Sequence, residues 1–308
     1  MRIFITGIAG FIGSAVARSL QKNGHYVTGI DNLFSGYASN LPSTITWKKG
    51  DIRYSSELDM LVDKYDVIIH LAAQTSGEKS FEVPEYDMDT NLKGSFNIFR
   101  FANKCKANLM INMSSMSVYG DVPHKATVNE NTPPSPVSLY GSTKLAAENI
   151  LNALSKQESL SVINLRLFNA YGEGQDLTEL KQGMVSIYLA YFLLYEKVTV
   201  KGSFDRVRDF IYIDDIVSAI EAVIDSERYQ SNTFNLCYGN PISVQTVLAS
   251  MQQALASDKQ IIQVGNTAGD VMGFAGNNEK FRHTMNWEPK FSFDKGIQKM
   301  IDYYKGLK

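Results

Sequence analysis

The stretch "ITGIAGFIG", residues 5–13, places three glycines where a strand-like run meets a helix-like run. Gly7, Gly10 and Gly13 allow a tight turn, and they let a pyrophosphate approach the backbone amides at a helix amino terminus, where the helix dipole favours an anion. Their spacing is GxxGxxG, whereas the standard dinucleotide fingerprint is GxGxxG. Taken alone, the pattern is also compatible with a plain turn, so the surrounding sequence decides its interpretation.

Short β-branched runs alternate with stretches of helical length through the first two-thirds of the chain. The alternation predicts repeated βαβ units, and hence an α/β fold with a Rossmann-type doubly wound parallel sheet. The runs are almost continuously apolar, as expected for strands covered by helices on both faces. The predicted strands are 2–6, 25–30, 45–49, 66–71, 109–114 and 161–168, and 234–237 is expected to return as one more strand.

An acidic residue ends the second predicted strand. Asp31 stands where a carboxylate accepts hydrogen bonds from both ribose hydroxyls of an adenosine and repels a 2'-phosphate, which predicts NAD as the cofactor and disfavours NADP. The alternative is an aspartate that only solvates a strand end. Asp51 and Ile52 end the third predicted strand and are placed to flank the adenine. The stretch "HLAA" (70–73) ends the fourth strand, where the cofactor should continue.

The alternation of strands and helices becomes irregular after about residue 170, where loops such as "YGEGQD" and "CYGNP" interrupt it. We therefore expect a smaller, interleaved α+β substrate-binding domain. The predicted NAD-binding Rossmann domain spans 1–170, with a return segment at about 204–237. The smaller domain takes 171–203 and 238–308.

Composition excludes several classes of function. A chain of 308 residues, 44% hydrophobic and 20% charged, is globular and long enough for one large domain or two medium ones. Its net charge of −2 provides no basic field, so nucleic acid is not an expected partner. Cys105 and Cys237 lie far apart without CxxC spacing, and the four histidines are scattered. A reducing compartment and the absence of a metal site are therefore expected.

The beginning of the chain, "MRIFIT", is strand-like and lacks the features of a signal peptide, which predicts a cytoplasmic protein. The most apolar run is "SIYLAYFLLY" (186–195), which has about half the length needed to span a bilayer. We expect a buried helix or a helix at a subunit contact here, and no membrane partner.

The stretch "LYGSTKLAAEN" (139–149) has the composition of an ordinary helix, and Lys144 follows Tyr140 by four residues on the same face. A free phenol has a pKa of about 10 and is a poor base at neutral pH. A nearby ammonium and an oxidised nicotinamide would lower that pKa, so that the phenolate could take a proton from a hydroxyl group.

Taken alone, YxxxK is more often a solvated helical pair. The glycine turn favours the catalytic interpretation, and so do Ser114 and Ser115, which end the fifth predicted strand. A hydroxyl at that place can hydrogen-bond the reacting oxygen.

Together with "DNLFSG", "GDI", "SSMSVYG", "RLFNAYG" and "RDFIYIDDI", these motifs resemble the extended branch of the short-chain dehydrogenase/reductase superfamily over nearly the entire chain. Within that branch, the sequence is similar to the NAD-dependent nucleotide-sugar epimerases related to UDP-glucose 4-epimerase. The resemblance implies an isomerase of carbohydrate biosynthesis that inverts C4 of a UDP-hexose or UDP-hexuronic acid through a transient 4-keto intermediate. It also implies a homodimer, for which the apolar faces around 94–102 and 144–154 are suited.

The resemblance also assigns residues by matching positions. It implies that Ser115 is the catalytic serine, that Tyr140 is the base and that Lys144 is its partner. It implies that Asn169 contacts the substrate diphosphate and that Arg208 clamps the nucleotide phosphate. The implied cofactor-binding residues are Gly7, Gly10, Phe11, Ile12, Gly13, Asp31, Asn32, Ser35, Gly36, Asp51, Ile52, Leu71, Ala72, Ala73, Tyr140 and Lys144. The implied substrate-binding residues are Thr75, Ser115, Asn169, Arg208, Asp270 and Phe274.

Departures from the pattern of the relatives refine this expectation. Met116 and Ser117 stand where related dehydratases carry an Asp-Glu pair and related decarboxylases keep a glutamate, which disfavours both reactions. Thr267 replaces the arginine that epimerases usually present three residues before Asp270, so a second phosphate clamp is missing. A phenyl ring at Phe274 fills space that a 2-acetamido group needs, which predicts a sugar without an N-acetyl group.

Two alternatives remain open at this point. One is a dehydrogenase, reductase or dehydratase of a nucleotide-linked sugar, in which NAD(H) exchanges freely where the reaction is a net oxidation or reduction. The other is a non-catalytic dinucleotide-binding protein, although such relatives lose the tyrosine or the lysine and this chain keeps Ser115, Tyr140 and Lys144. Tightly bound NAD in the purified protein would favour epimerisation over net oxidation or reduction.

Overall fold

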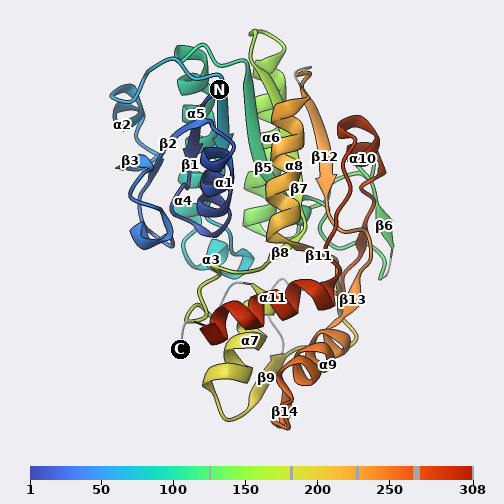
Figure 1. Cartoon of the computed structure of the whole chain (residues 1–308). Coiled ribbons are helices and arrows are strands. Elements are labelled where there is room, and N and C mark those ends of the chain that lie inside the picture. Colours follow the sequence, from blue (N-terminus) through green and yellow to red (C-terminus); the bar gives the residue numbers. More distant parts are fainter. Residues whose placement is uncertain (125, 181–182, 227–228, 266–270, 307–308) are drawn as a thin grey trace.

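The structure is a computed structural model that describes residues 1–124, 126–180, 183–226, 229–265 and 271–306. Two positions singled out in the sequence, Thr267 and Asp270, lie outside the described residues. Figure 1 shows a large upper part built around a sheet and a smaller lower part that contains helices α7, α9 and α11.

Seven strands of the described residues form one parallel sheet, in the order β12-β7-β5-β4-β1-β2-β3. Every predicted strand is confirmed, with ends that differ from the prediction by at most two residues. Edge strand β3 carries two exposed lysines, which discourage pairing with another chain. The strands are β1 (Arg2–Thr6), β2 (Tyr26–Asp31), β3 (Thr46–Lys49), β4 (Val67–His70), β5 (Leu109–Ser115), β7 (Ser161–Leu167) and β12 (Asn232–Leu236).

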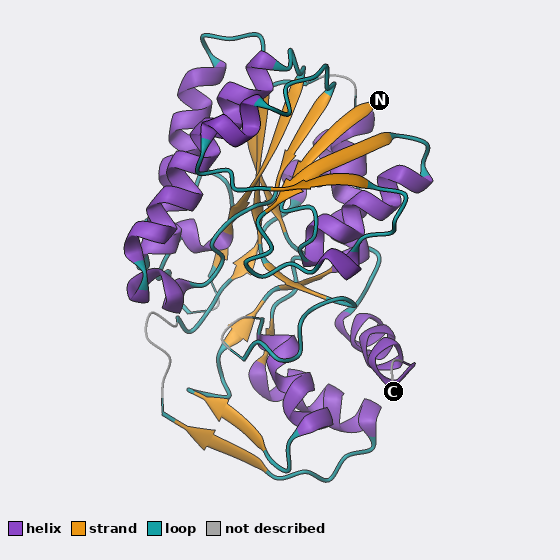
Figure 2. Cartoon of the chain, turned by 90° about the vertical axis from the view of Figure 1, so that its left-hand side faces the viewer, coloured by secondary structure: helices purple, strands orange, loops and turns teal. Residues whose placement is uncertain are grey.

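Helices cover both faces of this sheet (Figures 1 and 2). α1 (Phe11–Lys22) and α8 (Ile213–Asp225) lie on one face, and α5 (Ser95–Lys104) and α6 (Leu139–Ser155) lie on the other. Successive side chains of a strand point to opposite faces. Accordingly, Ile3 and Ile5 of β1 join the core on the α1 side, and Phe4 joins the core on the α5 side. The predicted doubly wound fold is confirmed.

The strand order reverses between β1 and β4, which makes a crevice at the carboxyl ends of these strands. The two ends approach each other closely, because a Cβ added to Gly7 would lie 2.8 Å from the backbone nitrogen of Ala72. The glycine turn, the loop after β4 and the end of β5 therefore meet at one edge of the sheet. In Figure 1 this edge faces the lower part of the molecule.

Shorter elements complete the described chain. Between the sheet strands lie α2 (Ser55–Asp59), α3 (Gly77–Glu82), α4 (Pro84–Asp87), a π-helical turn (Met88–Gly94) and 3-10 turns (Ala38–Asn40 and Met116–Val118). The two-stranded pairs are β8 (Asn169–Tyr171) with β11 (Phe210–Tyr212), β10 (Val207–Arg208) with β13 (Ile242–Ser243), β9 (Val198–Lys201) with β14 (Ile261–Val264), and β6 (Thr127–Val128) with β15 (Ala275–Gly276). The remaining helices are α7 (Met184–Leu194), α9 (Val244–Leu255), α10 (Glu279–Met285) and α11 (Phe293–Gly306). The domain division stays a prediction.

The apolar run at 186–195 forms most of helix α7, as predicted for a buried helix. Val185, Tyr188 and Leu189 are buried, and the helix packs against β9 and α9. Within the part of the chain that the structure describes, no helix is both long and apolar enough to cross a membrane.

Candidate active site

The glycine turn forms a cradle that side chains would fill. Gly7 has φ +68°, a conformation that favours glycine, and a Cβ on Gly13 would lie 2.0 Å from the carbonyl oxygen of Gly7. Helix α1 begins after Gly10 with no side-chain cap and no acidic residue in its first turn. Its amino-terminal N–H groups are therefore suited to the diphosphate of a dinucleotide. The residues present fit NAD.

We predict that Gly13→Ala lowers both stability and NAD content. The new methyl group would meet backbone atoms, so α1 must move away from β1, and overpacking of this kind costs about 1–3 kcal/mol. Thermal denaturation and the NAD released on denaturation measure the two effects. Gly77→Ala is the matched control, because its nearest neighbour would lie 3.8 Å away. A Gly13→Ala protein with normal NAD content would show that close packing of the turn is unnecessary.

Acidic and amide side chains surround the end of β2. Asp31 is buried, and its Oδ2 and Oδ1 accept hydrogen bonds from the backbone nitrogens of Ala9 (2.9 Å) and Leu33 (2.8 Å). Burial raises the pKa of Asp31, and these backbone bonds oppose the shift. Asn32 donates to Oδ2 of Asp51 at 3.0 Å. The residues predicted to frame the adenosine are thus brought together, while their contacts with a ribose stay a prediction.

The other predicted cofactor residues lie along the same edge. Gly36 packs on the glycine turn, since a Cβ there would lie 2.8 Å from the carbonyl carbon of Ala9. Ser35 beside it is exposed, and Ile52 is buried. The remaining predicted positions, Phe11, Ile12, Leu71, Ala72 and Ala73, are partly exposed, whereas Thr75 of the substrate set is exposed.

The three predicted catalytic residues meet at the end of β5. Ser115 is the last residue of that strand, and its side chain is near enough to the Tyr140 phenol to lower the pKa of that phenol. Ser138 caps helix α6 by accepting a hydrogen bond from the Gly141 nitrogen at 3.0 Å, which fixes Tyr140 in the first turn. Lys144 follows one turn later and is 2% exposed. The structure also separates the two candidate serines, because Ser114 donates its hydroxyl to Glu148.

The chain by itself does not make the phenol acidic. Burial raises the pKa of Tyr140 to about 12, with the Ser115 hydrogen bond lowering it and the charge of Asp87 raising it further. Burial lowers the pKa of Lys144 to about 8, against the charges of Glu148 and Asp87. The expectation that the lysine and a bound oxidised nicotinamide together lower the phenol pKa stays a prediction. A lower value needs additional positive charge, which an oxidised nicotinamide would supply.

A buried polar cluster behind Tyr140 and Lys144 was missed in the sequence. It joins the loop after β4, α4, the π-helical turn and α6. Its members are Gln74, Asp87, Asn91 and Thr143. In the sequence, the motif "YGSTK" indicated only Tyr140 and Lys144. A short motif cannot indicate residues that come together from separate segments of the chain.

His70 at the end of β4 is a structural residue. Its ring nitrogens bond to the hydroxyls of Thr6 (2.8 Å) and Ser95 (3.0 Å). Burial and the charge of Lys144 lower its pKa to about 3, so the ring stays neutral and cannot act as a base at neutral pH.

One predicted substrate residue, Asn169, lies at the same strand end. Asn169 of β8 lies 3.3 Å from the sulfur of Met116, the residue after Ser115, and its Nδ2 donates to the Asp209 carbonyl at 2.9 Å. Arg208 is buried in β10, and its Nη1 donates to the Val207 carbonyl at 2.8 Å. Their contacts with a substrate stay a prediction, as do those of Asp270, which is not described.

Phe274 is enclosed by aromatic residues. Its ring lies edge-on to Tyr119 and Phe168, with ring centroids 6.1 Å and 6.0 Å away, and is 1% exposed. Such a ring cannot turn aside without disturbing its neighbours. Its predicted place beside the sugar stays a prediction.

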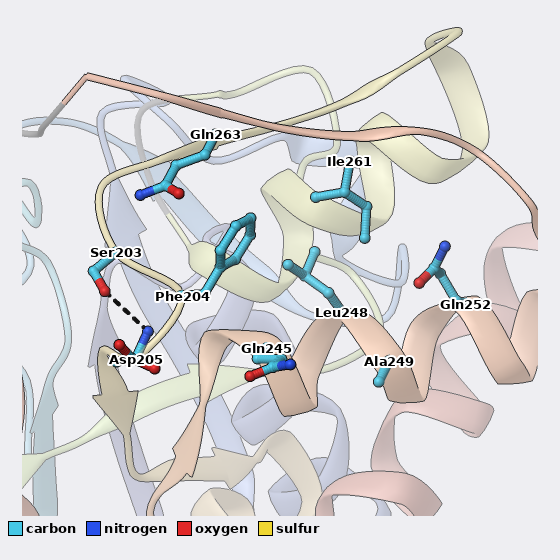
Figure 3. Close-up of a pocket in the computed structure, with 9 residues that line it drawn as sticks. All are labelled: Ser203, Phe204, Asp205, Gln245, Leu248, Ala249, Gln252, Ile261 and Gln263. Atoms are coloured by element: carbon cyan, nitrogen blue, oxygen red, sulfur yellow. Dashed lines mark hydrogen bonds between the residues drawn. The ribbon is translucent and has the colours of Figure 1, made fainter.

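A pocket of about 650 Å³ lies elsewhere, between α9, β14 and the loop at 203–205 (Figure 3). Gln245 and Gln252 line it from α9, and Ile261 and Gln263 line it from β14. None of Ser115, Tyr140 and Lys144 is among its lining residues. The size of a pocket does not outweigh the chemistry of its lining, so the catalytic site is assigned to the end of β5.

The chain is similar to known proteins over nearly its whole length. The chain is 29% identical to a UDP-glucose 4-epimerase of Mycolicibacterium smegmatis over 99% of both chains. It is 30% identical to UDP-glucuronic acid decarboxylase 1 of Xenopus tropicalis over 99% of this chain and 72% of that protein. In structure it resembles a UDP-glucose 4-epimerase of Thermotoga maritima solved with UDP-glucose, with TM-score 0.95, 29% identity and coverage of 100% and 99%.

A UDP-glucose 4-epimerase of Thermus thermophilus in complex with NAD has TM-score 0.92 and 27% identity, with both chains fully covered. The pattern that defines the NAD dependent epimerase/dehydratase family matches residues 3–237. The match contains the glycine cradle and all three residues at the end of β5. This chain therefore belongs to the NAD dependent epimerase/dehydratase family.

Proposed function

We propose that the protein is a 4-epimerase of a UDP-hexose or UDP-hexuronic acid, acting through a transient 4-keto sugar. The observation that carries the proposal is the clustering of Ser115, at the end of β5, with Tyr140 and buried Lys144, which share one helix, at the sheet edge that holds the glycine cradle. NAD, when bound, supplies a hydride acceptor that is regenerated in each turnover.

Tyr140, Ser115 and Lys144 have separate roles in the reaction at the O4 atom of the sugar. The Tyr140 oxygen takes the O4 proton while the C4–H bond breaks, and it returns that proton when the keto group is reduced on its opposite face. Ser115 holds the reacting oxygen by a hydrogen bond. The Lys144 ammonium stabilises negative charge that develops on the phenol oxygen.

Dehydration and decarboxylation of UDP-sugars need an additional acid or base beside the serine. Ser117 Oγ lies 3.1 Å from Ser115 Oγ, and the Met116 sulfur lies against Asn169. Neither side chain is a carboxylate, so dehydration is disfavoured. Decarboxylation of UDP-glucuronic acid is a second candidate because of the 30% identity to the frog decarboxylase. The same two residues argue against it.

The test is to incubate the purified protein with UDP-, dTDP- and GDP-sugars and to separate the products. Epimerisation gives an isomer of unchanged mass with no net change in NADH absorbance. A UDP-pentose with release of carbon dioxide would support decarboxylation. Net formation or consumption of NADH would support a dehydrogenase or reductase.

Phe274 is proposed to restrict the sugar. We predict that UDP-N-acetylglucosamine is turned over at least about tenfold less efficiently than UDP-glucose, because the fixed ring occupies the space of the acetamido group. Phe274→Val should bring the kcat/KM for UDP-N-acetylglucosamine closer to the kcat/KM for UDP-glucose. Equal turnover of the two sugars by the unaltered protein would overturn the proposed restriction.

We also propose a homodimer that forms through helices α5 and α6. Phe96 and Ile150 are exposed apolar side chains on these two helices, which pack side by side in each subunit. Light scattering measures the mass in solution.

A cytoplasmic site of action is proposed as well, and the buried free thiols of Cys105 and Cys237 suit a reducing compartment.

A further inference from the structure

A fully buried carboxylate lies behind the catalytic pair. Asp87, the last residue of α4, is 0% exposed. Its Oδ1 accepts a hydrogen bond from Thr143 Oγ1 at 2.6 Å. Its Oδ2 accepts from Gln74 Nε2 at 2.6 Å and from Asn91 Nδ2 at 3.1 Å. The loop after β4 and helix α6, which lie in other parts of the sequence, thus converge on this one group together with the neighbouring Asn91.

The contact with Thr143 reaches the catalytic helix directly. Thr143 precedes Lys144, and its hydroxyl also lies 3.0 Å from the carbonyl oxygen of Tyr140. Through its hydrogen bond with Thr143, Asp87 therefore holds in place the turn of α6 that separates Tyr140 from Lys144. A shift of that turn would move the phenol and the ammonium together.

The charge of Asp87 also needs a counter-charge, because an isolated buried carboxylate is strongly disfavoured. Its hydrogen-bond donors within the described residues are neutral amides and a hydroxyl. Its negative charge favours the protonated form of Lys144, after the larger effect of Glu148.

Glu148 also favours the protonated form of Lys144, and its effect is larger than that of Asp87. Glu148, one turn further along α6, forms an ion pair with Arg166 of β7 at 2.8 Å. His70 of β4 is neutral, and Tyr140 is the phenol itself. The negative charge of Asp87 thus adds to that of Glu148 in balancing the Lys144 ammonium.

We propose that Asp87 is a positioning residue that fixes the Tyr140–Lys144 turn through Thr143 and supplies part of the counter-charge of the Lys144 ammonium. The proposal rests on the proposed function, in which the Tyr140 oxygen is the base. It assigns no direct contact with the substrate to Asp87.

Asp87→Asn tests the charge. Removing the anion lowers the pKa of both Tyr140 and Lys144, because Asp87 raises both. Both limbs of the profile of kcat/KM against pH should therefore move to lower pH, by about one unit. A purely structural role would reduce the rate without moving the limbs. The control is Asp89→Asn, an exposed residue of the same segment that pairs with Lys93, and its profile should match that of the unaltered protein.

Thr143→Val tests the hydrogen bond that holds helix α6, because it removes the Thr143 hydroxyl and keeps the carboxylate of Asp87. It should lower kcat at least about tenfold with unmoved limbs, since a small misplacement of catalytic groups is costly. A folded Asp87→Asn protein with unmoved limbs would overturn the proposal. If Asp87→Asn does not fold, an unchanged kcat in Thr143→Val would overturn it. Absence of epimerisation by the unaltered protein would instead refute the proposed function.

Discussion

Replacement of Tyr140 by phenylalanine is expected to lower kcat by about 10²–10⁴-fold, the range that general acid–base groups contribute. The change removes only the phenol oxygen, whose pKa the Ser115 hydroxyl lowers and which is proposed to take the O4 proton. The ring itself remains, so helix α6 and its packing against the π-helical turn should be retained.

The measurement is the initial rate of UDP-glucose conversion, together with the thermal midpoint and NAD content of each protein. Tyr303→Phe is the matched control, because Tyr303 is 43% exposed on α11 and its variant should keep full activity. A Tyr140→Phe protein that retains more than about a tenth of the activity would remove the phenol from the role of base. The same result would also reopen the reading of the chain as a non-catalytic dinucleotide-binding protein.

Arg166→Met is expected to destabilise the protein by about 3–5 kcal/mol, the usual effect of removing one partner from a buried ion pair. Arg166 and Glu148 have side chains that are 8% and 2% exposed, and their closest atoms lie 2.8 Å apart. The guanidinium also donates to the Tyr119 hydroxyl at 3.0 Å, and Tyr119 in turn donates to Asn235 at 2.6 Å. The variant leaves Glu148 charged and buried without its partner.

Urea denaturation of the two proteins gives the difference in the free energy of unfolding. Adding Glu148→Gln to the variant should recover part of the loss, because the uncompensated charge is then absent. Lys104→Met removes an exposed pair with Asp59, whose side chains are 43% and 50% exposed, and should cost less than about 1 kcal/mol. An equally small effect of Arg166→Met would show that the buried pair contributes little.

The sheet could be predicted from the sequence because its information is local. Each buried strand is a short apolar run, and the glycine turn must lie between a strand and a helix. Gly7 and Gly13 were also recognised from the sequence as residues of the turn. The structure explains why they are glycines, because a Cβ at either position would clash with backbone atoms. Tyr140 and Lys144 were found by their helical spacing, and Ser115 by its position at the end of β5.

The electrostatics of the site could not be predicted in the same way. The spacing of Tyr140 and Lys144 suggested an acidic phenol, but it contains no information on how deeply the pair is buried. Burial raises the pKa of Tyr140 to about 12 in the chain alone. Asp87 escaped notice because Gln74 and Thr143, its hydrogen-bond donors, belong to other segments. Such a cluster exists only after the chain has folded.

The central claim is that C4 of the sugar is oxidised and reduced again within one site, with Tyr140 exchanging the O4 proton. Incubation of the purified protein with UDP-glucose that carries deuterium at C4, followed by NMR of the UDP-galactose formed, tests it most directly. The account predicts that the product keeps its deuterium at C4, with no NADH accumulating. Loss of the deuterium to solvent, or a product of altered mass, would contradict it.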